Sequence, residues 1–187
     1  MVDLASPLAG ATYAGFVTVR AGGLRGMITL RGDQDNPALA LALHQATGCD
    51  MPARRRVVGA GGNAVAWMSP DELLVMVPYA QARAIAATLS TALAGEFVTV
   101  ADVSDARAMF TLAGADVPEM LCKLCPVDFS TLAESEIRRT RAAQVATALW
   151  RSGAEEYRLI CFRSVAQYMF DLLSNAARPG SETGLYR

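Results

Sequence analysis

The sequence predicts a mixed α+β fold with mainly antiparallel sheets, built from two split βαβ units in tandem. Three observations predict it. The expected elements run β-α-β-β-α-β and then β-α-β-β-α along the 187 residues. Hydrophobic residues make up 52% of the chain, which is enough for a sizeable core. No low-complexity linker divides the sequence, so we expect a single domain over residues 24–177, with halves of about 24–103 and 104–177.

The two ends of the chain lie outside that predicted domain. Residues 1–23 are rich in Ala, Gly and Ser and show no sustained hydrophobic period, so we expect an extended arm. Residues 178–187 open with Pro179-Gly180 and remain mostly polar, so we expect a mobile tail.

The first half opens with a strand at residues 24–31, where apolar and polar side chains alternate. A helix follows, with Asn36 as its N-cap, Pro37 as its first residue and Gly48 at its C-terminal end. The rest of this half is expected to contain two short strands around a glycine-rich turn, a continuous apolar strand and a second helix, at residues 57–68, 73–77 and 80–94.

The two halves meet in the middle of the chain. A strand at residues 98–103 is predicted to end the first half, and a strand at residues 107–113 to begin the second, with a polar turn between them. Asp116 and Glu119 have the spacing of a capping box with Asp in place of Ser or Thr, and Pro126 stops the helix that they would begin.

A hairpin and a helix are expected to complete this half. The hairpin strands are residues 142–151 and 156–163, turned at residues 152–154. Ser164 is the expected N-cap of the last helix. The apolar face of that helix is predicted to contain Val165, Met169, Leu172 and Ala176.

Composition excludes several classes of function. Lys and Arg number 17 against 18 Asp and Glu, whereas a nucleic-acid-binding protein usually carries a basic excess. The N-terminus lacks the basic and apolar segments of a signal peptide, and no apolar run approaches the roughly 20 residues of a membrane-spanning helix. We therefore expect a reduced, cytoplasmic protein without a nucleic-acid or membrane partner.

The glycine-rich segment at residues 59–64 fits the loose dinucleotide-binding pattern G-x-G-x-x-A. That mechanism needs a helix N-terminus directly after the loop, so that backbone amides face the pyrophosphate. Residues 65–68 are predicted to form a strand instead. The pattern therefore favours a glycine-rich turn over a cofactor loop.

Cys122 and Cys125 form a C-x-x-C pair, but further zinc ligands would have to come from the scattered Cys49, Cys161 and His44. A thioredoxin-like pair sits at the start of a helix, whereas this pair lies at a helix end beside a proline. We interpret the pair as small core residues and predict no metal site. His44 is the only histidine and has no flanking nucleophile, so no catalytic residue is predicted.

Basic and aromatic residues leave two readings open. The arginine clusters could bind a polyanion or an acidic protein surface, although such runs are more often solvated loop charge. The clusters are Arg54, Arg55 and Arg56, and Arg138, Arg139 and Arg141. The larger aromatics could line a ring-binding pocket or belong to the core. These aromatics are Trp67, Trp150, Tyr157 and Tyr168.

The order and spacing of several segments resemble the gamma subunit family of heterotetrameric sarcosine oxidase, over roughly residues 24–177. The segments that carry the resemblance are residues 28–33, 59–62, 67–74, 102–107, 123–128 and 163–170. The resemblance implies a fold like that of the folate-binding aminomethyltransferases, with ferredoxin-like halves. It also implies a non-catalytic subunit that supports assembly of a complex, which demethylates sarcosine oxidatively and passes the one-carbon unit to tetrahydrofolate.

The same resemblance implies where the chemistry of the complex lies. Partners would be the alpha, beta and delta subunits; FAD, FMN and NAD would be held by alpha and beta, and zinc by delta. No cofactor is expected on this chain, and we expect its arm and tail to become ordered on assembly.

The alternative hypothesis is a free-standing folate-binding protein. Aminomethyltransferases carry a functional Asp in a segment that would align with residues 145–150, which here read VATALW without a carboxylate. Related folate-binding repair proteins carry K-G-C-Y-x-G-Q-E, of which only Lys123 and Cys125 are kept. The alternative would have to use Glu134, Glu136 and the Arg138 cluster in a pocket between the halves.

Overall fold

The computed structural model describes Ser6, Leu8 and residues 10–186 of the chain. It divides into two compact units, which we call the central unit, Arg25–Asp105, and the terminal unit, formed by Met1–Leu24 with Ala106–Arg187. The division lies between residues 105 and 106, close to the predicted boundary between the halves. Both units combine helices with an antiparallel sheet, so the predicted α+β fold is confirmed. Among the described residues, no helix is long and apolar enough to cross a membrane.

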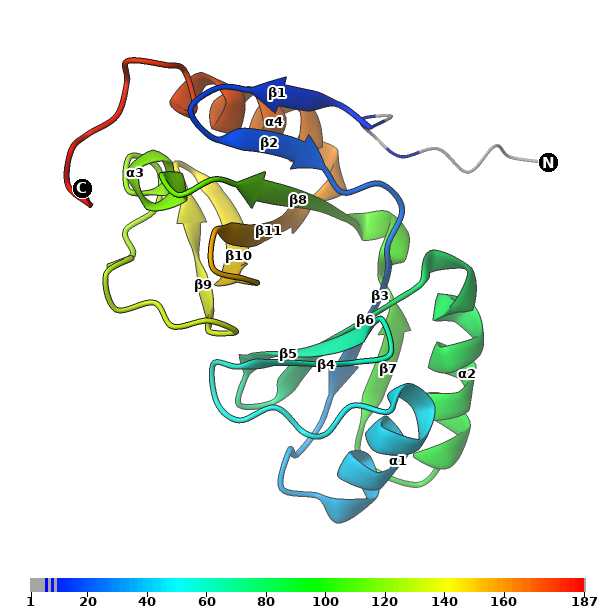
Figure 1. Cartoon of the computed structure of the whole chain (residues 1–187). Helices are drawn as coiled ribbons and strands as arrows, with labels where there is room; N and C mark the ends of the chain where they lie inside the picture. The colour runs from blue at the N-terminus through cyan, green and yellow to red at the C-terminus, as the bar shows by residue number, and fades with distance from the viewer. Residues whose placement is uncertain (1–5, 7, 9, 187) are drawn as a thin grey trace. The chain divides into compact units, whose positions relative to one another are not determined.

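The central unit is a five-stranded sheet with two helices on one face (Figure 1). The strand order is β4-β5-β6-β3-β7, and every neighbouring pair is antiparallel. Its elements are β3 (Gly26–Arg31), α1 (Pro37–Thr47), β4 (Val57–Ala60), β5 (Asn63–Ser69), β6 (Glu72–Val77), α2 (Ala82–Ala92) and β7 (Thr99–Asp102).

Local signals account for the boundaries of α1. The Asn36 side chain accepts a hydrogen bond from the Ala38 amide at 2.9 Å, and Pro37 occupies the first helical position. Gly48 has a φ of 73°, which closes the helix in the left-handed conformation that glycine favours. Leu39 and Leu43 are buried against the sheet residues of the same core. The predicted helix is therefore confirmed at both ends.

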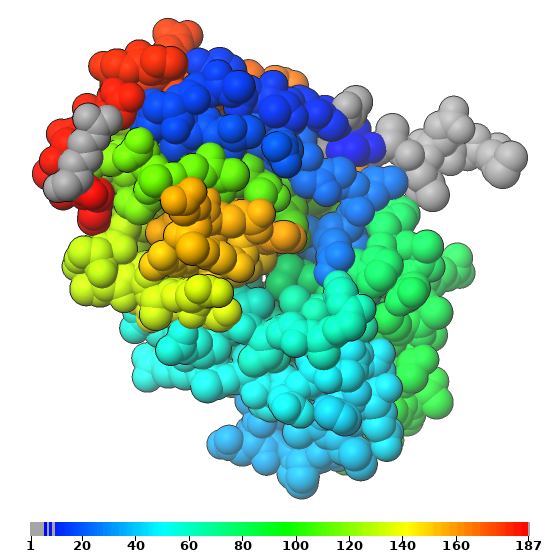
Figure 2. Space-filling view, in the orientation of Figure 1, coloured from blue at the N-terminus to red at the C-terminus, as the bar shows by residue number. Residues whose placement is uncertain are grey.

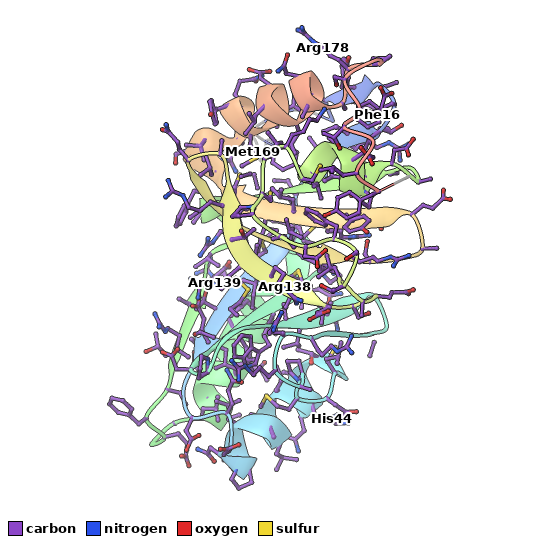
Figure 3. All side chains as sticks on the ribbon, turned by 90° about the vertical axis from the view of Figure 1, so that its left-hand side faces the viewer. Phe16, His44, Arg138, Arg139, Met169 and Arg178 are labelled. Carbon is purple, nitrogen blue, oxygen red and sulfur yellow. The ribbon has the colours of Figure 1, made fainter. Side chains whose placement is uncertain are left out.

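The terminal unit is a six-stranded sheet in the order β1-β2-β8-β11-β10-β9. Its elements are β1 (Thr12–Ala14), β2 (Thr18–Ala21), β8 (Arg107–Ala113), α3 (Val117–Leu121), β9 (Ile137–Ala142), β10 (Val145–Arg151), β11 (Glu156–Phe162) and α4 (Ala166–Ala176). Phe110, Leu159 and Met169 are fully buried in its core, and Figure 3 labels Met169 on α4.

The N-terminal arm predicted for residues 1–23 is wrong over the two strands β1 and β2. β2 pairs antiparallel with β8, with Val19 opposite Leu112, and the Val19 side chain is 0% exposed. The four-residue strand is too short to show a hydrophobic period, and its partner lies far along the chain, so no local signal marks it. The rest of that arm includes residues 1–5, 7 and 9, which lie outside the described part of the chain.

Two predicted helix caps are also wrong. Asp116 makes no side-chain capping bond at the start of α3, and the carboxylate of Glu119 binds the C-terminal segment instead. The last helix is capped by Val165 without a side-chain bond, because Ser164 belongs to a short 3-10 turn that precedes α4. In both places a tertiary contact or an extra turn replaces the local pattern.

Candidate functional site

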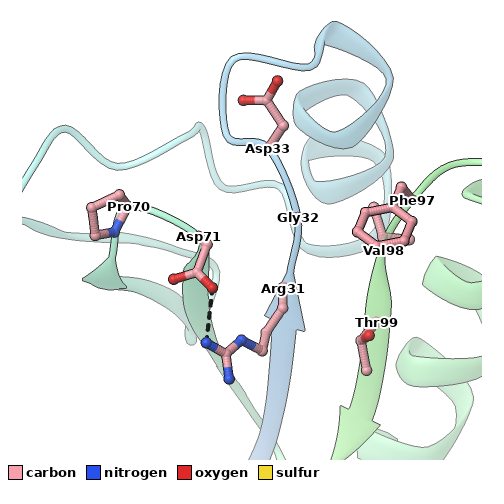
Figure 4. Close-up of a pocket in the computed structure, with 8 residues that line it drawn as sticks. All are labelled: Arg31, Gly32, Asp33, Pro70, Asp71, Phe97, Val98 and Thr99. Carbon is pink, nitrogen blue, oxygen red and sulfur yellow. Dashed lines mark hydrogen bonds and ion pairs between the residues drawn. The ribbon is translucent and has the colours of Figure 1, made fainter.

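A hollow of about 580 Å³ lies at one end of the central sheet, and we call it the rim pocket (Figure 4). Three neighbouring elements form it: the end of β3, the turn between β5 and β6, and the start of β7. Because β3 lies between β6 and β7, the sheet order itself brings these segments together. The lining residues are Arg31, Gly32, Asp33, Pro70, Asp71, Phe97, Val98 and Thr99.

One ion pair crosses the rim pocket. The Arg31 guanidinium donates to Asp71 Oδ2 at 2.8 Å, and the Ser69 hydroxyl donates to Asp71 Oδ1 at 2.5 Å. The Ser69 bond and then the Arg31 bond hold the pKa of Asp71 below its usual value. Both side chains are more than half exposed, so we expect the pair to orient the hairpin turn more than to stabilise the fold.

Gly32 keeps the floor of the pocket closely packed. A β-carbon at this position would lie 2.8 Å from Val98 Cγ1 and 3.1 Å from Leu39 Cδ1. The Gly32 amide also donates to the Asp71 carbonyl at 3.0 Å. The end of β3 can therefore lie this close to Val98 and Leu39 only because residue 32 lacks a side chain.

The loop before β7 places Phe97 at the lip of the pocket. Glu96 is held to the start of α1, since its carboxylate accepts from Asn36 Nδ2 at 2.8 Å. The next residue but one, Val98, packs against the core of the central unit. Phe97 lies between these two fixed positions and its side chain is 102% exposed. Among the exposed large apolar residues that the structure describes, Phe97 has the highest exposed fraction.

A second hollow of about 530 Å³ adjoins the rim pocket and shares Asp33 and Pro70 with it. It contains Arg54 and Trp67, one from each of the predicted basic and aromatic sets. The Gln34 side chain donates to the Ser69 carbonyl at 2.6 Å and so ties the loop after β3 to the end of β5. The two hollows therefore form a continuous uneven surface at this end of the sheet.

The glycine-rich segment is the turn of the β4–β5 hairpin, as the sequence predicts. Gly61 and Gly62 have φ angles of 56° and 87°, and β5 follows directly. The Arg25 guanidinium donates to the Gly62 carbonyl at 2.6 Å. No helix N-terminus faces this turn from the following segment, so the dinucleotide geometry is not formed.

The sequence-predicted metal and thiol candidates are dispersed. Cys125 and Cys161 are buried in the terminal-unit core, and burial raises their pKa to about 12 and about 11. Cys122 Sγ donates to the Glu119 carbonyl at 3.2 Å. His44 lies on α1 with its Nδ1 3.0 Å from Asp50 Oδ1, and both side chains are exposed. Within the described residues, no three His, Cys, Asp or Glu side chains are placed to hold a metal ion.

The groups required by a folate-binding alternative are already engaged. Arg138 and Arg139 lie on the edge strand β9 (Figure 3). The Arg138 guanidinium pairs with Glu136, and the two side chains are only 19% and 17% exposed. Glu136 also accepts from the Ala133 amide at 3.0 Å. Strand β10, where the resemblance implies that a folate-dependent relative would place its Asp, contributes no carboxylate. These residues therefore do not fit a folate site of that kind.

The predicted aromatics do not converge within the terminal unit. Tyr157 is buried in the core, with its ring edge-on to Phe129 at 6.4 Å between centroids. Trp150 is also buried, whereas Tyr168 on α4 is about half exposed. The core reading of the pattern therefore holds for Trp150 and Tyr157.

A buried carboxylate that sequence analysis assigned to a helix cap binds the C-terminal segment. Glu119 on α3 is 1% exposed and accepts hydrogen bonds from the Thr183 hydroxyl and from the amides of Gly184 and Tyr186. The Thr183 bond is the largest cause that lowers the pKa of Glu119, to about 2. A carboxylate that accepts several backbone bonds is strongly favoured in its charged form.

Lys123 secures the same segment from the end of α3. Its ammonium group donates to the carbonyls of Ala176 and Ser181 at 2.5 and 2.8 Å, and burial lowers its pKa. It also lies 5.2 Å from the ring centre of Phe16, in the turn between β1 and β2. The C-terminal segment, red in Figure 2, lies beside the blue β1–β2 hairpin. The expected mobile tail is thus held by specific contacts.

Comparisons with known proteins identify relatives over most of the chain. The model of the family described as sarcosine oxidase, gamma subunit, matches residues 31–178. The sarcosine oxidase subunit gamma of Arthrobacter sp is 30% identical over 185 residues, which cover 94% of this chain and 89% of that relative.

Solved structures agree with the sequence match. A chain of the heterotetrameric sarcosine oxidase from Corynebacterium sp. U-96, in complex with pyrrole 2-carboxylate, superposes with a TM-score of 0.82 and 30% identity. The match covers 92% of this chain and 93% of that one. Aminomethyltransferase T of the glycine cleavage system from Bartonella henselae superposes with a TM-score of 0.64 at 14% identity, covering 93% of this chain and 49% of that one, and so shares the fold alone.

Proposed function

The chain belongs to the sarcosine oxidase gamma subunit family, and from that premise we propose that it is a non-catalytic subunit of a heterotetrameric sarcosine oxidase. Its partners are the alpha, beta and delta subunits. One observation carries the proposal: the chain matches a chain of the Corynebacterium heterotetramer over 92% of its length at a TM-score of 0.82.

In this proposal the chain supports a complex whose chemistry takes place on other subunits. FAD, FMN and NAD belong to alpha and beta, zinc belongs to delta, and tetrahydrofolate accepts the one-carbon unit from sarcosine. Two ionic groups of the terminal unit favour a structural role, because Glu119, which is buried, and Lys123 bind the chain's own C-terminal segment. The cysteines described in the structure are unpaired, which suits a reducing cytoplasm.

Co-expression tests the proposal directly. The chain is produced with the alpha, beta and delta subunits of the same organism, and the complex is purified through a tag on the alpha subunit. We expect this chain to elute with the other three in stoichiometric amount. Elution of a stable alpha-beta-delta assembly without it would contradict the proposal.

Folate binding by the isolated chain separates the proposal from the free-standing alternative. The fold shared with aminomethyltransferase T is the observation that favours the alternative. Calorimetric titration of the purified chain with tetrahydrofolate is expected to give no heat of binding at micromolar concentration. A clear one-site isotherm would instead support a folate-binding protein.

A further inference from the structure

The C-terminal segment lies on the terminal unit without joining its sheet. Residues 181–186, which we call the strap, follow α4 and form no helix or strand. Figure 1 shows the strap, in red, running past α3. Its residues Thr183, Gly184 and Leu185 are exposed, and Leu185 is 72% exposed. The strap therefore buries little apolar surface, and a segment of this kind can open locally while the rest of the fold stays intact.

The surface under the strap is built around one buried carboxylate. Glu119 Oε2 accepts from the Thr183 hydroxyl at 2.5 Å and from the Gly184 amide at 2.6 Å. Glu119 Oε1 accepts from the Tyr186 amide. With the strap in place, Glu119 is 1% exposed. Hydrogen bonds to a charged acceptor are the strong ones, so a segment that presents the same three donors can occupy this position.

Contacts on either side of the carboxylate depend on the sequence of the strap. At its end, the Tyr186 hydroxyl accepts from the Phe129 amide at 3.2 Å, and the two rings pack edge-on at 6.2 Å between centroids. At its beginning, the Lys123 ammonium donates to the carbonyl and the hydroxyl of Ser181 at 2.8 and 3.0 Å. In peptide recognition, main-chain bonds supply affinity and side-chain contacts supply specificity, and both kinds are present here.

We propose that Glu119, Lys123 and Phe129 form a peptide-binding site, and that the strap is a detachable ligand of this site within the same chain. The site takes a short extended peptide that presents a hydroxyl, two amides two residues apart, and a tyrosine. While the strap is docked it excludes other peptides, so its opening controls access to the site. The inference concerns the isolated chain and does not rest on the proposed function.

Binding of the strap sequence as a separate peptide tests the proposal on the full chain. Gly184→Pro serves as the receptor, because Gly184 has a φ of 74°, which proline cannot adopt, and proline has no amide hydrogen to donate. A synthetic peptide of residues 179–187 is the ligand, and calorimetry measures its binding. We expect the peptide to bind Gly184→Pro at least about tenfold more tightly than the original chain, where the tethered strap competes at high effective concentration.

Further variants identify the contacts that bind the peptide. Leu185→Ala in the peptide is the matched control, since that side chain is exposed, and it should bind as tightly as the unchanged peptide. Tyr186→Ala in the peptide removes the ring contact, and Glu119→Gln in the Gly184→Pro chain removes the charged acceptor. Each is expected to weaken binding at least about tenfold. Absence of binding to a folded Gly184→Pro chain, or equal binding with and without the Glu119 carboxylate, would overturn the proposal.

Hydrogen exchange of the original chain is a second measurement that needs no variant. We expect the amides of Gly184 and Tyr186 to exchange through one shared local opening, far faster than the amides of β8, whose Phe110 lies in the terminal-unit core. If these amides exchange only as fast as those of β8, the strap does not detach. That result would overturn the proposal even if Gly184→Pro failed to fold.

Discussion

The central and terminal units reach the same arrangement of four strands by different routes along the chain. In the central unit the order β5-β6-β3-β7 is built from consecutive elements, with β7 following α2 to the edge beside β3. In the terminal unit the corresponding order is β10-β11-β8-β2, and the place beside β8 is filled by a strand from the N-terminus. The terminal unit is thus a circular permutation of the central one, in which β9 corresponds to the edge strand β4 and β1 is a further edge strand beside β2.

This difference decides which unit depends on the chain ends. The amide of Phe16, before β2, donates to the carbonyl of Ala177, just after α4, at 3.0 Å. Figure 3 labels Phe16 near Arg178, the residue that follows. The chain therefore passes the start of β2 directly after α4. In the central unit, the strand in the corresponding place, β7, follows α2 along the chain. The terminal unit needs both ends of the polypeptide in place, whereas the central unit needs neither.

The largest expected effect comes from breaking the permuted strand. Val19→Asp places an unpaired charge in the terminal-unit core, where Val19 is fully buried. We expect a loss of about 3–5 kcal/mol in the free energy of unfolding of that unit. Hydrogen exchange should show lost protection in β8 and α4 and retained protection in β3 and β6.

Arg20→Asp is the matched control for this prediction, because residue 20 lies on the same strand with an exposed side chain. It should change the unfolding free energy of the terminal unit little. Equal loss of protection in both units after Val19→Asp would show that the two units do not unfold separately. It would contradict the conclusion that only the terminal unit depends on the N-terminal strand.

A smaller loss of stability is expected from a substitution at Gly32, which packs closely against Val98 in the central unit. Gly32→Ala forces a β-carbon to within 2.8 Å of Val98 Cγ1, and the stiff valine side chain cannot move away freely. We expect about 1–3 kcal/mol of destabilisation, measured by urea unfolding and confined to the central unit by hydrogen exchange. Gly153→Ala is the control in the terminal unit, since its β-carbon would meet only Glu156 Cβ at 3.7 Å. A Gly32→Ala chain as stable as the original would exclude the tight packing.

The smallest effect is local and depends on pH. The pKa of Glu119 is about 2 in the folded chain against an ordinary value of 4.5, so its charge favours the folded state. The stabilisation is complete above about pH 4.5 and is lost as the pH falls through about 2. We expect the amides of Gly184 and Tyr186 to lose protection from exchange across this window, relative to the intrinsic exchange rate at each pH.

Glu119→Gln should reproduce the low-pH behaviour at neutral pH, with faster exchange confined to residues 183–186, and it should remove the pH dependence. Glu155→Gln, an exposed carboxyl in the same unit, is the control. Slow exchange of these amides in Glu119→Gln would show that the carboxylate does not hold the segment.

Sequence alone predicted the central unit well because its signals are local. The Asn36 cap, the Gly48 helix end and the glycine-rich turn each act within a few residues, and each lies where predicted. Sequence-based prediction failed at β2, because that strand is defined by its pairing with Leu112 and the neighbouring residues of β8. A short stretch of sequence around β2 does not contain those partners. Glu119 was assigned to a cap for the same reason, since its true partners lie at residues 183–186.

The sequence by itself determined the fold class and the resemblance to the gamma subunits, because hydrophobic period, turn residues and segment order are properties of neighbouring residues. Tertiary structure alone decided which strand completes the terminal sheet, what the buried carboxylate of Glu119 binds, and that the Phe97 ring faces solvent. Those outcomes follow from contacts between distant segments, and the burial of a side chain is set by the surfaces that meet around it rather than by its own chemistry.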